Sequence, residues 1–159
     1  MSTRASAVTI RDSAETDIAS IQDIYAHHVL FGTASFELTP PTLDEMRQRR
    51  ADVLGKDLPY LVAEQNGVVV GYAYVTPYRP RPAYRFTVED SVYVRQGLAG
   101  QGIGSLLLAE TIKICTKKGY RQMMAVVGDA HLPSVALHQN HGFTIWSLSR
   151  MGWWWATPT

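Results

Sequence analysis

The chain has 159 residues and a formal net charge of +1, which indicates one domain without a strong overall electrostatic field. We therefore expect neither nucleic acid nor a membrane surface as a partner, because both recruit proteins with an excess of positive charge. Hydrophobic residues make up 46% of the chain and charged residues 18%, which is typical of a globular protein.

Cys115 is the only cysteine, so an intrachain disulfide is excluded and a cytoplasmic location is favoured. Residues 1–7 contain no apolar signal core, and no apolar run in the sequence is long enough to span a bilayer. Neither a repeat nor a linker rich in Pro, Gly and Ser interrupts the sequence. We expect residues 1–159 to form a single domain, with a flexible start over 1–7 and a short, atypical tail over 149–159.

The first half of the chain is predicted to form a strand, two helices and three strands. Apolar residues at helical spacing mark the first helix, and Thr42 and Glu45 have the spacing of a capping box at the start of the second. The Gln-Asn-Gly triplet at 65–67 predicts a hairpin between two of the strands. The expected elements are a strand over 8–11, helices over 18–29 and 42–54, and strands over 61–63, 68–75 and 86–94.

The second half is predicted to alternate helices and strands. The apolar residues of 103–118 recur at helical spacing, and Gly119 is placed to end that helix. The remaining elements are a strand over 123–127, a helix over 134–141 that Gly142 ends, and a strand over 143–148. This order predicts an α/β sandwich in which helices flank a mixed sheet.

A glycine-rich turn joins the strand over 86–94 to the long helix that begins at Ile103. Its sequence from 95 to 105 is Arg-Gln-Gly-Leu-Ala-Gly-Gln-Gly-Ile-Gly-Ser. Because a helix N-terminus presents unpaired N–H groups and a positive dipole, the turn suits a phosphate group. The alternative is that the glycines only allow a tight turn. Nucleoside triphosphate loops need a Gly-Lys-Ser/Thr sequence that is missing here, and Ser105 stands where dinucleotide-binding turns have their third glycine.

The turn and the helix after it resemble the coenzyme A motif of the GNAT superfamily of N-acetyltransferases. Two further stretches, 79–94 and 134–143, resemble the phosphinothricin and methionine sulfoximine acetyltransferases within it. The resemblance implies a mixed, mostly antiparallel sheet flanked by helices, with two strands splayed apart at the cofactor loop. It also implies direct transfer, in a ternary complex and without a metal, from acetyl-coenzyme A (acetyl-CoA) to the amino group of a small, amino-acid-like substrate.

Acetylation of an amine requires a base, because an aliphatic amine is mostly protonated at neutral pH. By resemblance, Glu89 on the strand before the turn is that base, and the backbone N–H of Val94 donates to the oxygen of the tetrahedral intermediate. His138 stands where many relatives carry a tyrosine that protonates the leaving thiolate. Two interpretations of His138 are open: it is a catalytic acid, or it packs and forms hydrogen bonds.

The resemblance also assigns the residues that hold cofactor and substrate. Acetyl-CoA is expected to contact Val92, Tyr93, Val94, Gly100, Gln101, Gly102, Ile103, Gly104, Ser105 and His131. The substrate is expected to contact Glu89 and Phe36, together with a cluster, formed by Arg79, Arg81 and Tyr84, that grips its acidic end. Two residues depart from the family pattern. Ala99 stands where the family usually has glutamine or arginine, and His131 stands where it usually has asparagine.

Two other functions remain as alternatives. One is a non-catalytic module that binds coenzyme A or a metabolite, which the departures at Ala99 and His131 and the short tail motivate. The other is an acetyltransferase for protein N-termini or polyamines, although the arginine cluster would repel a polyamine. We interpret four further residues as ordinary helix or core residues: His27, His28, His141 and Cys115.

The end of the chain departs furthest from the family. Relatives continue past the position of Phe143 with a hairpin whose last strand completes the sheet, and here only residues 144–159 remain. We expect the returning strand to be absent, which would leave a strand edge uncovered beside Trp153, Trp154 and Trp155. Two copies could cover each other's edge, so we predict a homodimer in which these tryptophans are largely buried in the interface or folded back onto the domain. The resemblance also favours a dimer, because relatives in this subfamily are often dimers.

Overall fold

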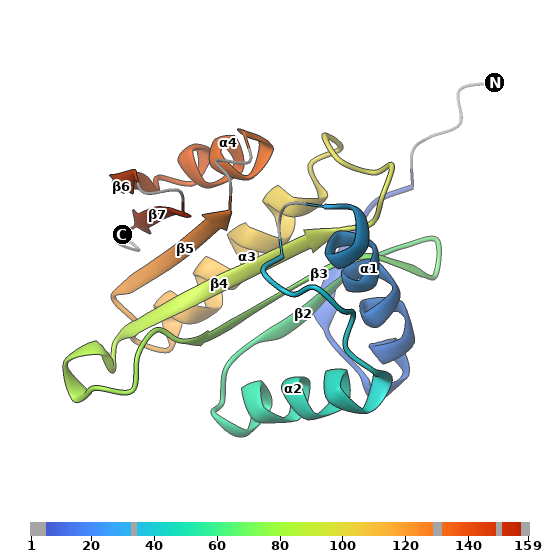
Figure 1. Cartoon of the computed structure of the whole chain (residues 1–159), viewed down its shortest axis with the longest axis horizontal. Helices are drawn as coiled ribbons and strands as arrows, with labels where there is room; N and C mark the ends of the chain where they lie inside the picture. Colours follow the sequence, from blue (N-terminus) through green and yellow to red (C-terminus); the bar gives the residue numbers. More distant parts are fainter. Residues whose placement is uncertain (1–5, 33–34, 129–131, 149–150, 157–159) are drawn as a thin grey trace.

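A computed structural model describes residues 6–32, 35–128, 132–148 and 151–156 and shows a single seven-stranded sheet with helices on its faces (Figure 1). The strands, in the spatial order β1-β2-β3-β4-β5-β7-β6, are β1 (Thr9–Asp12), β2 (Tyr60–Gln65), β3 (Val68–Pro77), β4 (Thr87–Val94), β5 (Gln122–Gly128), β6 (Thr144–Leu148) and β7 (Met151–Ala156). The helices are α1 (Ile18–Phe31), α2 (Leu43–Gly55), α3 (Ile103–Lys117) and α4 (Leu132–Asn140), with short 3-10 turns η1 (Glu15–Asp17) and η2 (Pro82–Tyr84).

The strand pairing makes the sheet mixed and mostly antiparallel. Among the described strand pairs, only β4 and β5 run parallel, and α3 forms the crossover between them. The predicted capping box starts α2: the N–H of Glu45 donates to Thr42 Oγ1 at 3.2 Å, and the N–H of Thr42 donates to Glu45 Oε2 at 2.6 Å. The predicted α/β architecture is therefore confirmed. Within the described ranges, no helix combines the length and the apolar character needed to cross a membrane.

Helices α1 and α2 cover one face of the sheet and α3 covers the other (Figure 1). Because side chains alternate along a strand, neighbouring residues of β2 join different clusters: Tyr60 packs in the cluster with α1 and α2, and Leu61 packs against α3. Gly71 on β3 lets α3 come close, since a Cβ at this position would lie 3.1 Å from a methyl carbon of Leu107.

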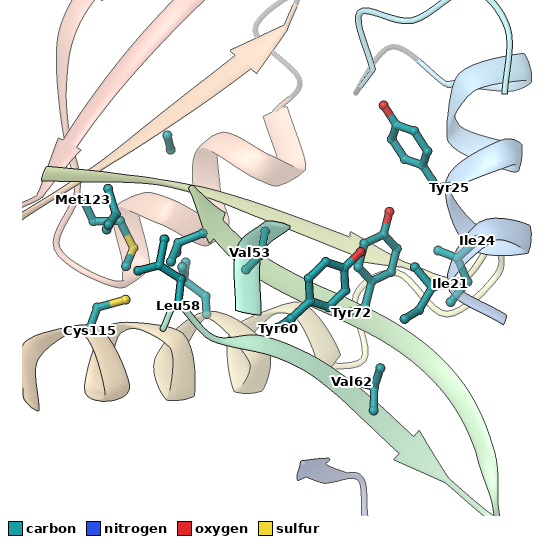
Figure 2. Packing of buried hydrophobic residues seen from close by; sticks show 14 of the residues in the cluster. Ile21, Ile24, Tyr25, Val53, Leu58, Tyr60, Val62, Tyr72, Cys115 and Met123 are labelled. Atoms are coloured by element: carbon teal, nitrogen blue, oxygen red, sulfur yellow. The ribbon is translucent and has the colours of Figure 1, made fainter. Parts of the chain in front are cut away.

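A row of tyrosines lies between the sheet and α1. The rings of Tyr60 and Tyr74 stack with centroids 4.9 Å apart, and Tyr72 stacks on Tyr93 at 5.2 Å. Tyr25 of α1 meets the ring of Tyr93 edge to face, also at 5.2 Å. Figure 2 shows Tyr25 above Tyr72, with Ile21 and Ile24 of α1 beside Tyr72. The tyrosine row therefore extends the apolar core from the middle of the sheet to the end of β4.

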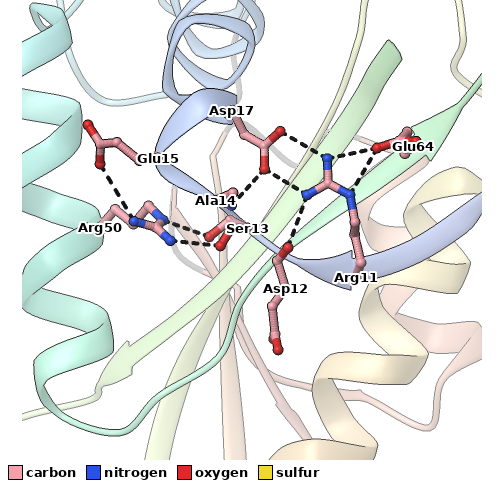
Figure 3. A network of polar contacts seen from close by, with 8 residues as sticks. All are labelled: Arg11, Asp12, Ser13, Ala14, Glu15, Asp17, Arg50 and Glu64. Carbon is pink, nitrogen blue, oxygen red and sulfur yellow. Dashed lines mark hydrogen bonds and ion pairs between the residues drawn. The ribbon is translucent and has the colours of Figure 1, made fainter. Parts of the chain in front are cut away.

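Polar contacts attach the first strand to both N-terminal helices (Figure 3). The guanidinium group of Arg11 donates to both oxygens of Asp17 and to Glu64 on β2, at distances between 2.7 and 3.0 Å. The hydrogen bonds from Arg11 lower the pKa of the Asp17 carboxyl, although burial acts in the opposite direction. Arg50 of α2 donates to the side chain and the carbonyl of Ser13. These contacts fix where α1 begins.

The C-terminal end of the sheet corrects one sequence prediction. Strand β7 pairs antiparallel with both β5 and β6, so that Trp154 lies opposite Ala125 on one side and Ile145 on the other. The expectation of a missing final strand is wrong, because the segment that we interpreted as an atypical tail is itself the returning strand. Tryptophan has a high propensity for strands, and the β6–β7 hairpin brings this segment beside β5. The burial of the three tryptophan side chains lies outside what the structure describes.

Candidate active site

The parallel strands β4 and β5 separate halfway along their length. They pair from Thr87 opposite Gln122 to Asp90 opposite Ala125, and beyond this point β4 continues to Val94 without pairing to β5. Strand β3 stays paired with β4 up to Val94, so only the β5 side opens. We call this opening the β4–β5 gap. The predicted splay of two strands before the glycine-rich turn is confirmed.

The gap exposes backbone donors of β4. The N–H of Arg95 donates to the carbonyl of Val70 at 2.8 Å, so the odd-numbered residues of β4 direct their backbone groups toward β3. The N–H groups of Val92 and Val94 consequently face the gap. His28 of α1 donates from Nε2 to the carbonyl of Val94 at 2.8 Å and so restrains the end of the strand. An extended ligand in the gap would meet two aligned amide donors.

The glycine-rich turn lies at the open end of the gap and leads into α3. Gly102 is the N-cap residue of α3 with a φ of 81°, a left-handed conformation that favours glycine, and a Cβ at this position would meet only open space. Arg95 anchors the start of the turn through Asp23 of α1 and the carbonyl of Val69. Ser105, in the first turn of α3, bonds through its hydroxyl to His141 Nε2 at 2.8 Å. The N-terminus of α3 presents unpaired backbone N–H groups, an arrangement that suits a phosphate.

Two hollows meet at Glu89. The first, with a volume of about 240 Å³, follows the gap and is lined by residues of β4, β5, α1, α4 and the loop after α1. The second, of about 500 Å³, is lined by Tyr78, Arg79, Pro80, Arg81, Tyr84 and Glu89. The predicted arginine and tyrosine cluster is thus brought together. Because Glu89 belongs to both hollows, it stands between the gap and the basic cluster.

The carboxyl group of Glu89 has a raised pKa. Partial burial is the main cause and the neighbouring carboxylate of Asp90 adds to it, whereas the positive charge of Arg79 opposes it. A carboxylate with a raised pKa holds a proton more readily, which suits a base that must deprotonate an ammonium group near neutral pH. Successive residues of a strand point to opposite faces, so Glu89 faces the α1 side and Asp90 faces α4.

Asp90 forms a buried pair with His138. Their side chains are 1% and 6% exposed, and His138 Nε2 lies 2.8 Å from Asp90 Oδ2. His138 Nδ1 lies 2.7 Å from the carbonyl oxygen of Ser134. Burial lowers the pKa of His138, but the charge and hydrogen bond of Asp90 outweigh it and the net pKa is raised. Both ring nitrogens of His138 therefore form hydrogen bonds within the fold.

The loop after α1 forms the wall of the first hollow opposite Glu89. Tyr25 donates from its hydroxyl to Glu37, and Arg49 of α2 binds both oxygens of the same carboxylate at 2.6 and 2.9 Å. Burial and the contact with Glu37 raise the pKa of Tyr25 to about 12. Phe36 lines the hollow as predicted and is 61% exposed. The Glu37 network therefore holds Phe36 over the gap.

A family model described as the acetyltransferase (GNAT) family matches residues 21–143. The chain belongs to this family. The phosphinothricin N-acetyltransferase of Alcaligenes faecalis is 52% identical over 138 residues, which cover 86% of this chain and 70% of that protein. An L-methionine sulfoximine/L-methionine sulfone acetyltransferase of Salmonella typhimurium is 37% identical over 140 residues, which cover 87% of this chain and 81% of that protein.

A solved structure extends the likeness of this GNAT chain to three dimensions. It is a phosphinothricin acetyltransferase of Sinorhizobium meliloti in complex with acetyl-CoA, with a TM-score of 0.90 and 40% sequence identity. The match covers 94% of this chain and 88% of that one. The resemblance inferred from the three sequence motifs is therefore confirmed.

Some contacts of this GNAT chain could not be predicted from its sequence. His28 forms a hydrogen bond with the carbonyl of Val94, and His141 forms one with the hydroxyl of Ser105. The Asp90 contact was missed because its partner lies 48 residues away in the sequence. The predicted contact of His131 falls outside the described residues. Within those residues, no group of three or more His, Cys, Asp or Glu side chains is placed to hold a metal ion.

Proposed function

We propose that this chain is an N-acetyltransferase that moves an acetyl group directly from acetyl-CoA to the amino group of a small, amino-acid-like substrate. One observation carries the proposal: Glu89 lies between the β4–β5 gap, which suits the cosubstrate, and the basic hollow, which suits an acidic substrate. The relatives named as phosphinothricin and methionine sulfoximine acetyltransferases support it. They do not favour a non-catalytic module or an acetyltransferase for other amines.

The length of the gap supports acetyl-CoA. From Val94 to Glu89 a strand spans five residue steps, roughly 17 Å at about 3.4 Å each. A ligand with its phosphates at the glycine-rich turn and its reactive group beside Glu89 must therefore be long and thin, as the thiol arm of coenzyme A is. We propose that the arm lies along Val92, Tyr93 and Val94 and that the pyrophosphate binds Gly100, Gln101, Gly102, Ile103, Gly104 and Ser105, with His131 as a further contact.

In the proposed reaction the substrate enters as an ammonium ion and Glu89 accepts one proton from it. The amine nitrogen then attacks the thioester carbon, and the N–H of Val94 donates to the oxygen that becomes negative. The C–S bond breaks as the nitrogen loses its second proton, so that one proton ends on the thiol and one in solvent. We propose that His138 protonates the leaving thiolate. For this transfer, the proton on its Nε2 must leave the hydrogen bond with Asp90.

The basic hollow supports a substrate with an acidic group. Arg79 and Arg81 supply guanidinium groups that bind carboxylates or phosphinates, and Tyr84 supplies a hydroxyl. The positive cluster at one end and Glu89 at the other match a molecule that carries an acid and an amine. Phe36 covers the apolar part between them.

We also propose that residues 1–159 form a single domain, that the protein is a homodimer and that it is located in the cytoplasm. We expect it to bind no nucleic acid, membrane or metal. Because β7 pairs with β5, the edge of β5 is not available for a second copy. One outer edge of the sheet is β6, where Ile145 is 43% exposed, and uncovered edges favour pairing with another chain. The buried free thiol of Cys115 is consistent with a reducing compartment.

The decisive experiment measures thiol release from acetyl-CoA with phosphinothricin, methionine sulfoximine, free amino acids and spermidine. We expect turnover with the acidic amines and none with spermidine. Arg81→Ala should raise the KM for a carboxylate substrate more than the KM for its amide. Turnover with spermidine, or equal losses for acid and amide, would contradict the assignment of the basic hollow.

A further inference from the structure

The loop between α1 and α2 carries Phe36, a residue that its own packing does not fix. Residues 35–41 form neither a helix nor a strand, and Phe36 lines the first hollow although it is 61% exposed. A ring with this much exposure makes few packing contacts, so its position depends on the backbone that carries it. The contacts of the two neighbouring residues therefore decide where the ring lies.

Both neighbours of Phe36 are bound to the hydroxyl of Tyr25 on α1. Ser35 Oγ lies 3.0 Å from the hydroxyl oxygen of Tyr25, and this hydroxyl donates to Glu37 Oε2. The N–H of Glu37 also donates to Ser35 Oγ at 3.1 Å. The backbone on either side of the ring is thus attached to one point on α1.

Arg49 of α2 supplies the second attachment of this loop. Its two terminal nitrogens donate to both oxygens of the Glu37 carboxylate at 2.6 and 2.9 Å, a paired geometry that makes such bonds strong and directional. These hydrogen bonds lower the pKa of Glu37, so the carboxylate stays charged near neutral pH. Arg49 lines neither of the two hollows that meet at Glu89. Its contact with the loop is the route by which it reaches a ligand there.

We propose that Arg49 is a positioning residue for substrate selectivity: by holding Glu37, it keeps the Phe36 ring against the apolar chain of the amine substrate. This inference rests on the proposed function. Phe36 and Glu89 line the same hollow, so a substrate whose amine meets Glu89 places its carbon chain beside the ring. Burial against a fixed ring favours a longer chain by about fourfold for each methylene removed from water. A ring that is not held must be ordered when the substrate binds, and this entropy cost cancels part of the gain.

The ratio of kcat/KM for norvaline to kcat/KM for alanine tests this inference. The two amino acids differ only in two methylenes of the side chain, and both are assayed by thiol release from acetyl-CoA on one preparation of the full chain. Because such a ratio does not depend on the fraction of folded enzyme, a variant that is only less stable leaves it unchanged. We expect a ratio of about ten in wild-type protein, since most of the two methylenes is buried.

Arg49→Leu should lower this ratio to about three or less, and Phe36→Ala should lower it as far. Adding Arg49→Leu to Phe36→Ala should have no further effect, because the ring through which the arginine acts is gone. The matched control is Arg47→Leu on the same helix. The guanidinium group of Arg47 binds Glu15 and Asp44, so its loss should leave the ratio unchanged.

A wild-type ratio in Arg49→Leu would overturn the inference, as would an equal loss in the Arg47→Leu control. A further fall of the ratio when Arg49→Leu is added to Phe36→Ala would also overturn it, because the arginine would then act by another route. So would a wild-type protein that acetylates methionine sulfoximine without preferring norvaline to alanine. If wild-type protein acetylates none of the amino-acid-like substrates, the proposed function itself fails.

Discussion

The buried pair of Asp90 and His138 makes a prediction about stability. His138→Phe keeps a ring of similar size against Phe143, whose ring centroid lies 4.8 Å from that of His138, but leaves the Asp90 carboxylate buried without its partner. Removing one member of a buried pair costs about 3–5 kcal/mol of unfolding free energy. In a protein of this size each kcal/mol lowers the Tm by about 2–4 °C, so we expect a fall of roughly 6–20 °C.

Urea and thermal unfolding followed by circular dichroism at pH 6 measure this loss. The matched control is His141→Phe, in which a half-buried histidine bonded to a serine hydroxyl is replaced and no carboxylate is left unpaired. The double variant Asp90→Leu/His138→Phe should recover much of the lost free energy, because removing both partners leaves no buried charge. A loss below about 1 kcal/mol in His138→Phe, with no recovery in the double variant, would refute the reasoning from burial.

The pair also predicts a pH dependence with a definite sign. The pKa of His138 is raised in the folded protein, because the Asp90 carboxylate outweighs the effect of burial. Its contribution to stability is therefore complete below the ordinary histidine pKa of about 6.5 and is lost as the pH rises through the raised folded value. The free-energy difference between wild type and the double variant should fall with rising pH in this window. A difference that stays constant from pH 6 to 9 would show that the ring binds no proton there.

Substitutions at three positions, two of them with control variants, test the site. Gly102→Asp should abolish the rise in Tm that acetyl-CoA produces in wild-type protein, because it adds bulk and negative charge to the glycine-rich turn. The control is Gly67→Asp, at a hairpin glycine with a similar φ of 75°, which should keep that rise. Glu89→Gln should lower kcat by about a hundredfold or more while the Kd of acetyl-CoA stays constant, and an unchanged kcat would remove Glu89 from the mechanism. His28→Leu should lower kcat more than it raises the KM for acetyl-CoA, because it frees the Val94 carbonyl, and His28→Asn, which keeps a donor, should restore part of the rate. Equal rates in both His28 variants would show that the contact has no catalytic consequence.

The elements of the fold could be predicted from local signals. The capping box at Thr42, the hairpin triplet before β3 and the apolar stripe of α3 each depend on residues close together in the sequence. The glycine-rich turn was recognised in the same way, because a left-handed N-cap glycine is a local requirement of the backbone. Glu89 precedes this turn on the same strand, and its role as the base was predicted from the resemblance to the family. The returning strand was missed because no local pattern says which strands a tryptophan-rich segment will pair with.

The sequence by itself therefore determined the family and the order of the elements as far as β6, because both depend on contiguous motifs. It also supplied the predictions that Glu89 is the base and that the glycine-rich turn binds phosphate. Only the tertiary structure decided which side chains meet. The contacts of His138 with Asp90, of His28 with the Val94 carbonyl and of Glu37 with Arg49 join elements that are distant in sequence or separated by a loop. Their geometry depends on how α1, α2 and α4 pack on the sheet, and packing sums many weak contacts that leave no motif in the chain.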